Sequence, residues 1–377
     1  MRDVALDNPH VRRELLSQRY AADGKPVARL TQAQKAGITR FRDAVARGKL
    51  TYEDVPACLL CGETEQPVIS EKDNQGLPHL LVCCPGCGFI YAVRRLDGES
   101  LGSYYSTFYR DMNEGETTPA IVDARFAEAR AVMAAAQAKM VAALGLKRDD
   151  TVVELGAGGG WNLAPIADAG FRAIGFDYDP KFIAYGRERG IEMHNLVETS
   201  PDKVVPEGAA LVVVREVVEH VADPFTFLAE INSYLRPDGY LYLTAPSLAE
   251  IPFGYAAGDP LEEFQIPHLY LFDEFTLPAF LEMAGFRLRS QRADLKLIAQ
   301  RVAKPARVQH RIPGNYARAM RRLRFAETIA RHLWSTLYRR ILGRNYRRYF
   351  KLTRLVALTL SGSRRATFLE RRRRTGL

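Results

Sequence analysis

Short apolar runs alternate with stretches of helical spacing through the middle of the chain, from Thr151 to about Val302. Continuous runs of this length, set between helical segments, are typical of strands buried on both faces in βαβ units. The pattern therefore predicts an α/β domain with a mostly parallel sheet. The last two runs are close together and predict an antiparallel hairpin at the edge of that sheet. The runs are Thr151–Leu155, Ala173–Phe176, Leu211–Val214, Tyr240–Thr244, Phe286–Ser290 and Lys296–Val302.

Helical spacing dominates the rest of the chain. Apolar residues recur at helical intervals from Val27 to Phe41, so residues 1–50 are expected to form a helical segment. An alanine-rich stretch predicts a long helix over 121–144 that stops at Gly145, and residues 310–377 combine helical spacing with many arginines. We expect four parts: a helical segment (1–50), a cysteine-containing module (51–112), the α/β domain (113–302) and a basic helical extension (303–377).

The composition is that of an ordinary globular protein, with 47% hydrophobic and 26% charged residues among 377. This excludes collagen-like and wholly disordered chains, and we expect neither a transmembrane helix nor a signal peptide. The charge is unevenly distributed. Residues 301–377 hold 22 Lys and Arg against two acids, a net charge of +20, whereas the whole chain has a net charge of +9. The rest of the chain therefore has a net charge of −11. This asymmetry suggests a polyanionic partner for the tail.

A glycine-rich turn, Gly156–Gly160, follows the first apolar run directly. Such a turn lets a ligand approach the backbone, and the helix after it offers free N–H groups. Asp177 ends the next run, where a carboxylate can accept hydrogen bonds from a ribose. A dinucleotide-binding turn would need glycine at Trp161, and no Gly-Lys-Ser/Thr of a phosphate-binding loop follows. Glu154 would repel a pyrophosphate but attract the cationic amino-acid end of S-adenosylmethionine.

This order of an acid, three alternating glycines and a second acid resembles the first motif of class I S-adenosylmethionine-dependent methyltransferases. The resemblance continues across about residues 113–300 and implies a Rossmann-like sheet, with Leu211–Pro224 similar to the family's fourth strand and its exit loop. Ala210 departs from the pattern, because many relatives carry an acid there. The resemblance implies that S-adenosylmethionine is bound by Glu154, Gly156, Gly158, Gly160, Asp177, Tyr178, Arg215 and Glu216.

Candidate catalytic residues follow the fourth predicted strand. Methyl transfer is an in-line displacement at an activated methyl group, so the protein must position the reactants and accept a proton from the acceptor. His220 is the preferred base because its ordinary pKa lies near neutrality, and Glu219 or Glu216 would orient it. His268, after a long insertion, is a second candidate. The alternatives are an exposed ring at a helix start for His220 and a packing role for His268.

Two C-x-x-C-G knuckles lie 22 residues apart in the second part of the chain. Four thiolates at this spacing predict a tetrahedral structural zinc site without an open coordination position. A redox pair and an iron–sulfur cluster are the alternatives. The fifth cysteine, Cys83, is expected to pack on the opposite strand face from its neighbour. The predicted ligands are Cys58, Cys61, Cys84 and Cys87.

The knuckles, Asp73–Leu77 and a tyrosine-rich stretch before the α/β domain resemble zinc-module methyltransferases of sugar and surface-polysaccharide biosynthesis. In that group the front module helps to shape the acceptor pocket. The resemblance implies that Tyr104, Tyr105 and Tyr109 line a sugar site. The alternative is that these side chains pack the module onto the main domain.

Arginines in the tail alternate with apolar and aromatic residues at intervals of three and four, as with Leu323, Leu333 and Trp334. A basic amphipathic helix suits an anionic membrane surface, so residues 315–358 are the candidate segment. RNA or DNA is a rival partner. In the third alternative the apolar stripe packs on the acidic body.

Together these patterns predict a cytoplasmic enzyme, placed peripherally at the inner face of the membrane if the tail binds it. It would transfer a methyl group from S-adenosylmethionine to a small-molecule or glycan acceptor, with a sugar hydroxyl preferred. Methylation at a sugar carbon is one alternative. Another is an rRNA or tRNA base methyltransferase whose zinc module and tail hold RNA, and a third is a non-catalytic scaffold.

Overall fold

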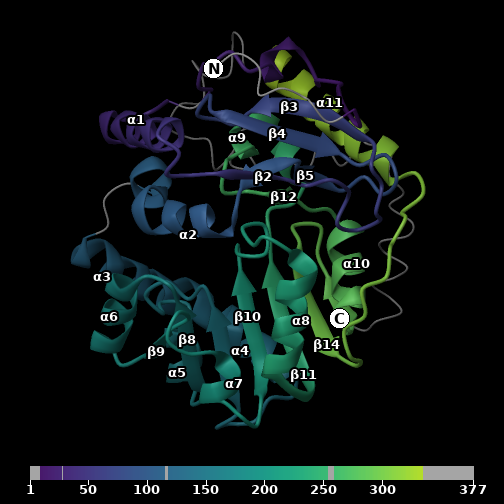
Figure 1. Cartoon of the computed structure of the whole chain (residues 1–377). Helices are drawn as coiled ribbons and strands as arrows, with labels where there is room; N and C mark the ends of the chain where they lie inside the picture. Colours follow the sequence, from purple (N-terminus) through teal and green to yellow (C-terminus); the bar gives the residue numbers. More distant parts are fainter. Residues whose placement is uncertain (1–8, 28, 115–117, 254–258, 334–377) are drawn as a thin grey trace.

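The computed structural model describes residues 9–27, 29–114, 118–253 and 259–333 (Figure 1). Its larger part is a seven-stranded sheet of order β13-β14-β11-β10-β7-β8-β9. Neighbouring strands are parallel except where β14 pairs, so the predicted parallel sheet with an antiparallel edge hairpin is confirmed. The strands are β7 (Thr151–Leu155), β8 (Arg172–Asp177), β9 (Glu192–Asn195), β10 (Ala209–Arg215), β11 (Leu235–Thr244), β13 (Phe286–Gln291) and β14 (Lys296–Arg301).

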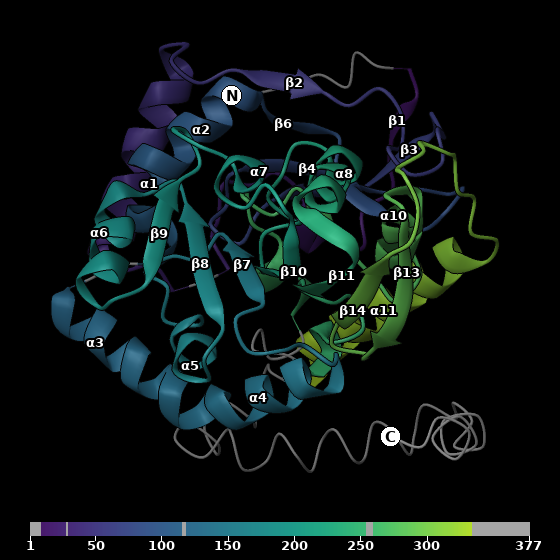
Figure 2. The same cartoon turned by 90° about the horizontal axis from the view of Figure 1, so that it is seen from below.

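Successive side chains of the central strands enter different cores, as expected for strands buried on both faces. Val152 belongs to one core and Val153 to the other, and Leu211 and Val212 divide in the same way. Figure 2 shows helices on both faces of the sheet. The first core is covered by α3 (Pro119–Glu128), α4 (Ala134–Ala143), α5 (Ala164–Asp168) and α6 (Pro180–Glu188), and the second by α8 (Pro224–Tyr234) and α10 (Thr276–Met283).

The helix predicted over 121–144 consists of α3 and α4, joined by the π-helical turn η3 (Ala129–Met133). Three shorter helices lie between other elements of the domain. They are α7 (Pro201–Val204), η4 (Ile251–Phe253) and α9 (Pro260–Glu263).

A second sheet holds the cysteines and lies beyond the carboxyl ends of the central strands (Figure 1). Its five strands have the order β1-β3-β4-β5-β12, and a separate two-stranded ribbon pairs β2 with β6. The last strand, β12, comes from the insertion after β11, so this sheet crosses the boundary expected at residue 112. The strands are β1 (Val11–Arg13), β2 (Tyr52–Asp54), β3 (Gln66–Lys72), β4 (Pro78–Cys83), β5 (Ile90–Ala92), β6 (Arg94–Leu96) and β12 (Tyr270–Leu271).

The N-terminal part is less helical than the sequence predicts. The long helix α1 covers only Gln32–Ala46, and Val11–Arg13 instead pairs in parallel with β3. Backbone hydrogen bonds to a neighbouring strand decide this, because so short and charged a segment carries little helical or strand preference of its own. Two helical segments follow the ribbon, α2 (Gly98–Thr107) and η2 (Arg110–Glu114), and a short turn, η1 (Gln18–Tyr20), precedes α1.

After β14 the chain returns to the cysteine-containing sheet. The backbone N–H groups of His310 and Ile312 donate to the carbonyls of Leu60 and Gly86, one in each knuckle. Asn315 is fully buried, and its Nδ2 donates to the Cys87 carbonyl at 3.0 Å and to Asp273 Oδ2 at 2.8 Å. The segment 309–315 therefore ties the knuckles to the larger domain.

Helix α11 (Asn315–Leu333) begins at this tie and packs its apolar face on the cysteine-containing sheet. Leu323 is fully buried there beside Ile69 and Leu81, whereas Phe325 stays 49% exposed. Within the described residues the stripe thus packs on the body, which was the third alternative for the tail. Residues 334–358 of the proposed membrane-binding segment lie outside the described residues. None of the described helices has the length and hydropathy of a membrane span.

Candidate functional site

The sheet order reverses between β7 and β10, because β8 and β9 lie on one side of β7 and β11 lies beyond β10. In open α/β sheets, ligands bind outside the carboxyl ends of the strands at such a switch point. The predicted donor-binding residues follow β7, β8 and β10 and therefore meet at this edge. The cysteine-containing sheet faces the same edge (Figure 1).

The glycine-rich turn adopts backbone angles that glycine favours, with φ of 69° at Gly156 and 55° at Gly158. A Cβ at Gly156 would lie 2.6 Å from Val217 Cγ2, so the turn needs glycine there for space as well as for conformation. The N–H of Gly158 donates to Asp177 Oδ2 at 2.7 Å. The turn and the acid are thus held together as one unit.

Asp177 also accepts the N–H of Asp179 through Oδ1 at 2.9 Å. Burial raises the pKa of its carboxyl group, and the two backbone N–H groups oppose that shift. Tyr178, the next residue, is 68% exposed and lies over no partner ring in the described structure. Its predicted contact with the donor therefore depends on the ligand and stays a prediction.

Glu154 lies at the end of β7 with 1% of its side chain exposed. Its Oε1 accepts hydrogen bonds from Arg215 Nε at 3.1 Å and from Asn162 Nδ2 at 3.4 Å, and its Oε2 has no partner among the described residues. Burial raises the pKa of this carboxyl to about 7, and Arg215 limits the rise. A buried carboxyl oxygen that lacks a donor is suited to receive a cationic ligand.

Glu216 directly follows β10 and has a positive φ of 51°. Its carboxylate accepts a hydrogen bond from Thr244 Oγ1 at the end of β11 at 2.8 Å. Burial raises its pKa. The side chain therefore joins the ends of β10 and β11, next to the switch point.

Glu219, His220 and His268 come together, although 48 residues separate the two histidines in the sequence. Their candidate ligand atoms all lie within 4.8 Å of one another, and the two imidazole centroids are 4.9 Å apart. His220 Nε2 lies 3.7 Å from Glu219 Oε1. Burial lowers the pKa of His220 to about 4 and that of His268 to about 3, so both rings are neutral at pH 7.

Tyr105 reaches this group from α2, in the part that carries the cysteines. Its hydroxyl lies 2.8 Å from His220 Nδ1, and the same ring nitrogen lies 2.8 Å from the carbonyl of Pro267. Tyr104 is fully buried and its hydroxyl accepts from Asn113 Nδ2, so it packs within the module. Tyr109 lies with its ring 6.4 Å from that of His220. Two of the three predicted tyrosines thus border the histidines.

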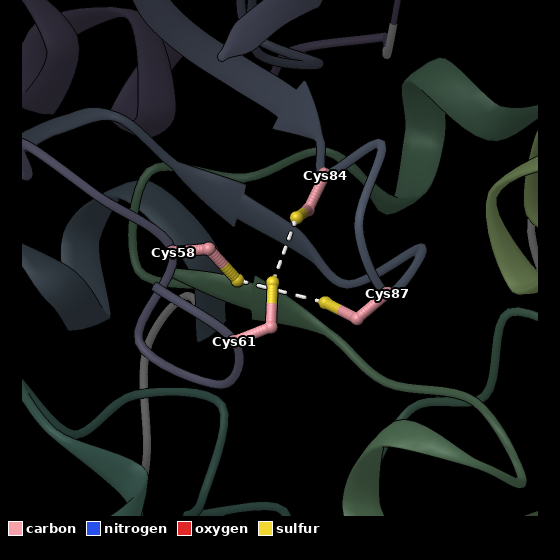
Figure 3. Close-up of side chains that lie close together, drawn as sticks. All are labelled: Cys58, Cys61, Cys84 and Cys87. Atoms are coloured by element: carbon pink, nitrogen blue, oxygen red, sulfur yellow. Dashed lines mark hydrogen bonds between the residues drawn. The ribbon is translucent and has the colours of Figure 1, made fainter. Parts of the chain in front are cut away.

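The four predicted cysteine ligands converge from two loops (Figure 3). The Sγ atoms of Cys58 and Cys87 are 3.6 Å apart and those of Cys61 and Cys84 are 3.4 Å apart. Sulfurs bound at about 2.3 Å around a tetrahedral zinc would be about 3.8 Å apart, so the arrangement fits that ion. Cys83 is also buried but belongs to a different core from Cys84, as strand alternation predicts.

A comparison with known families identifies the larger domain. A family model described as a methyltransferase domain matches residues 126–291. Residues 126–291 thus have the fold of a methyltransferase domain. The prediction of a Rossmann-like methyltransferase fold is thereby confirmed at the level of the domain.

Two relatives of this region are named as methyltransferases. A probable S-adenosylmethionine-dependent methyltransferase of Mycolicibacterium smegmatis is 34% identical over 142 residues, which are 36% of this chain and 52% of that protein. A ubiquinone biosynthesis O-methyltransferase of Caulobacter vibrioides is 32% identical over 100 residues, 25% of this chain and 39% of that protein. The chain thus spans about half or less of the length of these relatives.

Among solved structures, a magnesium protoporphyrin IX methyltransferase of Synechocystis PCC 6803 with bound SAH is 15% identical. It aligns with 54% of this chain and 100% of its own, at a TM-score of 0.38.

Sequence reasoning missed three features around the methyltransferase domain: the Glu154–Arg215 ion pair, the Tyr105–His220 hydrogen bond and the burial of His79. The first had a signal, because both residues lie at the ends of predicted strands. The Tyr105–His220 contact joins the module to the domain over a long sequence separation, and no local pattern marks it or the burial of His79.

Proposed function

We propose that the protein transfers a methyl group from S-adenosylmethionine to a hydroxyl group of a glycan or other small-molecule acceptor. The observation that carries this proposal is the adjacency of two sets of residues at one sheet edge. One set, Glu154, Gly158 and Asp177, fits the donor. The other, Glu219, His220 and His268, offers lone pairs to an acceptor. The match of residues 126–291 to the methyltransferase family supports the assignment.

The donor site is proposed at the switch point. Asp177 would accept the ribose hydroxyls, because its carboxylate is held at the end of β8 by the turn itself. The free Oε2 of Glu154 would attract the cationic end of the donor. Gly156 and Gly160 would let the ligand approach the backbone, while Arg215, Glu216 and Tyr178 would border it.

The acceptor is proposed to lie against Glu219, His220 and His268. The methyl carbon of the donor is already activated, so the group needs only to orient the acceptor oxygen and to take its proton. In the metal-free chain the free Nε2 of His220 is the expected proton acceptor, because burial keeps the ring neutral and Nδ1 faces the Pro267 carbonyl. Tyr105 and Tyr109 would offer ring faces and hydroxyls to a sugar.

Transfer to oxygen is supported by the names of several relatives, which describe O-methylation in ubiquinone biosynthesis. Transfer to carbon of a ketosugar would use the same base. Methylation of RNA is the second candidate, favoured only by the basic extension, whose described part pairs Arg322 with Glu274 of the body.

Structural zinc is proposed at Cys58, Cys61, Cys84 and Cys87. The four thiols are buried, and their separations fit a tetrahedral site closed to other ligands. The chelated ion would hold the two knuckles on which segment 309–315 rests.

Calorimetry with S-adenosylmethionine and its demethylated product tests the donor site, and we expect heat from both ligands. Radiolabelled methyl transfer to nucleotide sugars, lipid-linked saccharides and RNA tests the acceptor. Absence of binding to either ligand, with uptake of a nicotinamide nucleotide instead, would refute the proposal. Label transferred to RNA and not to saccharides would replace the acceptor with the second candidate.

A further inference from the structure

The side chains of Glu219, His220 and His268 bring several atoms with lone pairs together, without a matching hydrogen-bond donor. Glu219 is fully buried, and neither of its carboxylate oxygens has a hydrogen-bond partner on any other described residue. A buried carboxylate left in this state loses several kcal/mol of solvation, so it requires either a proton or a cation. The neighbouring histidines donate no hydrogen bond to either oxygen.

Both histidines are oriented by the backbone. His220 Nδ1 lies 2.8 Å from the carbonyl of Pro267, which fixes its proton on that nitrogen and leaves the lone pair of Nε2 toward Glu219. His268 makes a hydrogen bond to the backbone of Glu263. Metal-binding histidines are held in this way, with one ring N–H donated to a carbonyl and the other nitrogen free for the ion.

We propose that Glu219, His220 and His268 bind one divalent cation of the zinc type, distinct from the ion of the four cysteines. The three ligand atoms lie within 4.8 Å of one another, and one carboxylate with two imidazoles is a ligand set of catalytic zinc sites. Three protein ligands leave a fourth position open. A water or the acceptor oxygen would occupy that position.

The chemical consequence rests on the proposed methyl transfer and specifies how the group takes the proton. A water bound to such an ion is ionised near neutral pH. The bound hydroxide takes the proton of the acceptor O–H and becomes water. The acceptor oxygen then forms a bond to the methyl carbon, and the S–C bond breaks with its electron pair left on sulfur. With the ion present, His220 is a ligand rather than the base.

The position of the group fits a shared site. Glu219 and His220 follow β10. His268 lies two residues before β12, the strand that the insertion contributes to the cysteine-containing sheet. The Leu269 N–H donates to the Glu219 carbonyl at 2.9 Å, which holds the two segments together. The ion would therefore lie where both sheets contribute to the acceptor site.

The test is the metal content of the full chain after equilibration with zinc and removal of loosely bound ions. We expect two zinc ions per native chain, and one in Glu219→Gln and in His268→Ala. The matched control is Glu192→Gln, because Glu192 and His194 form a similar pair at 3.1 Å on β9, with no third candidate ligand among the residues that the structure describes. It should retain two. One ion in the native chain at saturating zinc, or two ions in the variants, would overturn the inference.

A measurement on the native chain avoids dependence on the variants' folding. Cobalt added to protein that retains its cysteine-bound zinc should give visible bands without thiolate charge transfer, and the absence of visible bands would count against the site. Calorimetry with S-adenosylmethionine on the same samples separates the two proposals. Loss of donor binding with two ions present would remove the proposed function and leave the ion site standing.

Discussion

At the scale of single residues, the proposed donor site depends on a carboxyl group whose pKa lies near neutrality. Glu154 is buried at the end of β7, and its pKa is raised to about 7 although Arg215 lies against it. The arginine neutralises one oxygen and leaves the other available. Ligand binding must therefore include the ionisation of this group.

We predict that the affinity for S-adenosylmethionine increases as the pH rises through about 7. Below that pH the carboxyl is protonated in the free protein and must lose its proton before it can attract the cationic ligand. The affinity should fall roughly tenfold per pH unit on the acid side. Calorimetry over a range of about three pH units around pH 7 measures this dependence. Glu154→Gln should bind weakly at every pH, and a pH-dependent Glu154→Gln would contradict the assignment.

His220 offers a second prediction at this scale. His220→Ala should reduce kcat by about 10²–10⁴, because either the base or a metal ligand is removed, and should leave donor affinity unchanged. Initial-rate kinetics with calorimetry in parallel check this. His194→Ala is the control, since that ring stacks on Phe176 away from the proposed acceptor. Unaltered turnover in His220→Ala would move the chemistry to another residue.

At the scale of elements, Gly88 in the second knuckle limits how segment 309–315 packs against that knuckle. Gly88 has φ of 72°, and a Cβ there would lie 2.7 Å from the backbone carbon of Asn315. Gly24 has nearly the same φ, 71°, but no atom within 4 Å of such a Cβ. A comparison of alanine substitutions at the two positions therefore separates the cost of backbone strain from the cost of steric contact.

We therefore predict that Gly24→Ala costs about 1 kcal/mol of unfolding free energy, the strain of a left-handed alanine. Gly88→Ala should cost about 1–3 kcal/mol more, because segment 309–315 must move off the knuckle. Chemical denaturation measures both variants. Equal losses would show that the contact between Gly88 and Asn315 contributes nothing to stability.

The elements also show what the sequence can predict. Four of the buried runs and the edge hairpin lie where their apolar patterns place them, because strands buried on both faces need continuous apolar residues. Strand β9, Glu192–Asn195, has a single apolar side chain among polar ones, and β12 has two residues. Both exist through pairing with a neighbour, so no local pattern could predict them.

The same limit applies to the site. Glu154, Gly156, Gly158 and Asp177 could be placed from the sequence, because each lies at the end of a predicted strand or in the turn that follows it. The meeting of His220 with His268 and Tyr105 could not, since it depends on how the insertion and α2 pack over the sheet. Sequence reasoning named the histidines as alternatives, whereas the structure places them in one group.

At the scale of the whole molecule, one core extends across both sheets. The ring of Phe89, which follows the second knuckle, stacks on that of Tyr270 with the two centroids 5.4 Å apart. It also meets the ring of Phe280 of α10, with a centroid distance of 5.1 Å. Cys58 and Cys87 belong to the same buried cluster as Val212 and Leu228 of the larger domain. The module and the methyltransferase domain should therefore unfold together.

We predict that removing the zinc proposed at the four cysteines lowers the stability of the whole chain by at least about 5 kcal/mol, on the scale of structural zinc sites. Calorimetric scans with and without a strong chelator should show one transition that moves to lower temperature. Two separate transitions after chelation, with the upper one unchanged, would show that the larger domain is independent of the ion.

Strand β12 has a consequence for protein engineering. Its two residues pair with Tyr91 and Ile90 at the edge of the cysteine-containing sheet, yet they are encoded some 180 positions later in the chain. Residues 51–112 alone consequently do not contain every strand of the cysteine-containing sheet. Transplanting these residues onto another catalytic scaffold, in order to exchange acceptor preference, would require the stretch around Tyr270 to travel with them as a second fragment.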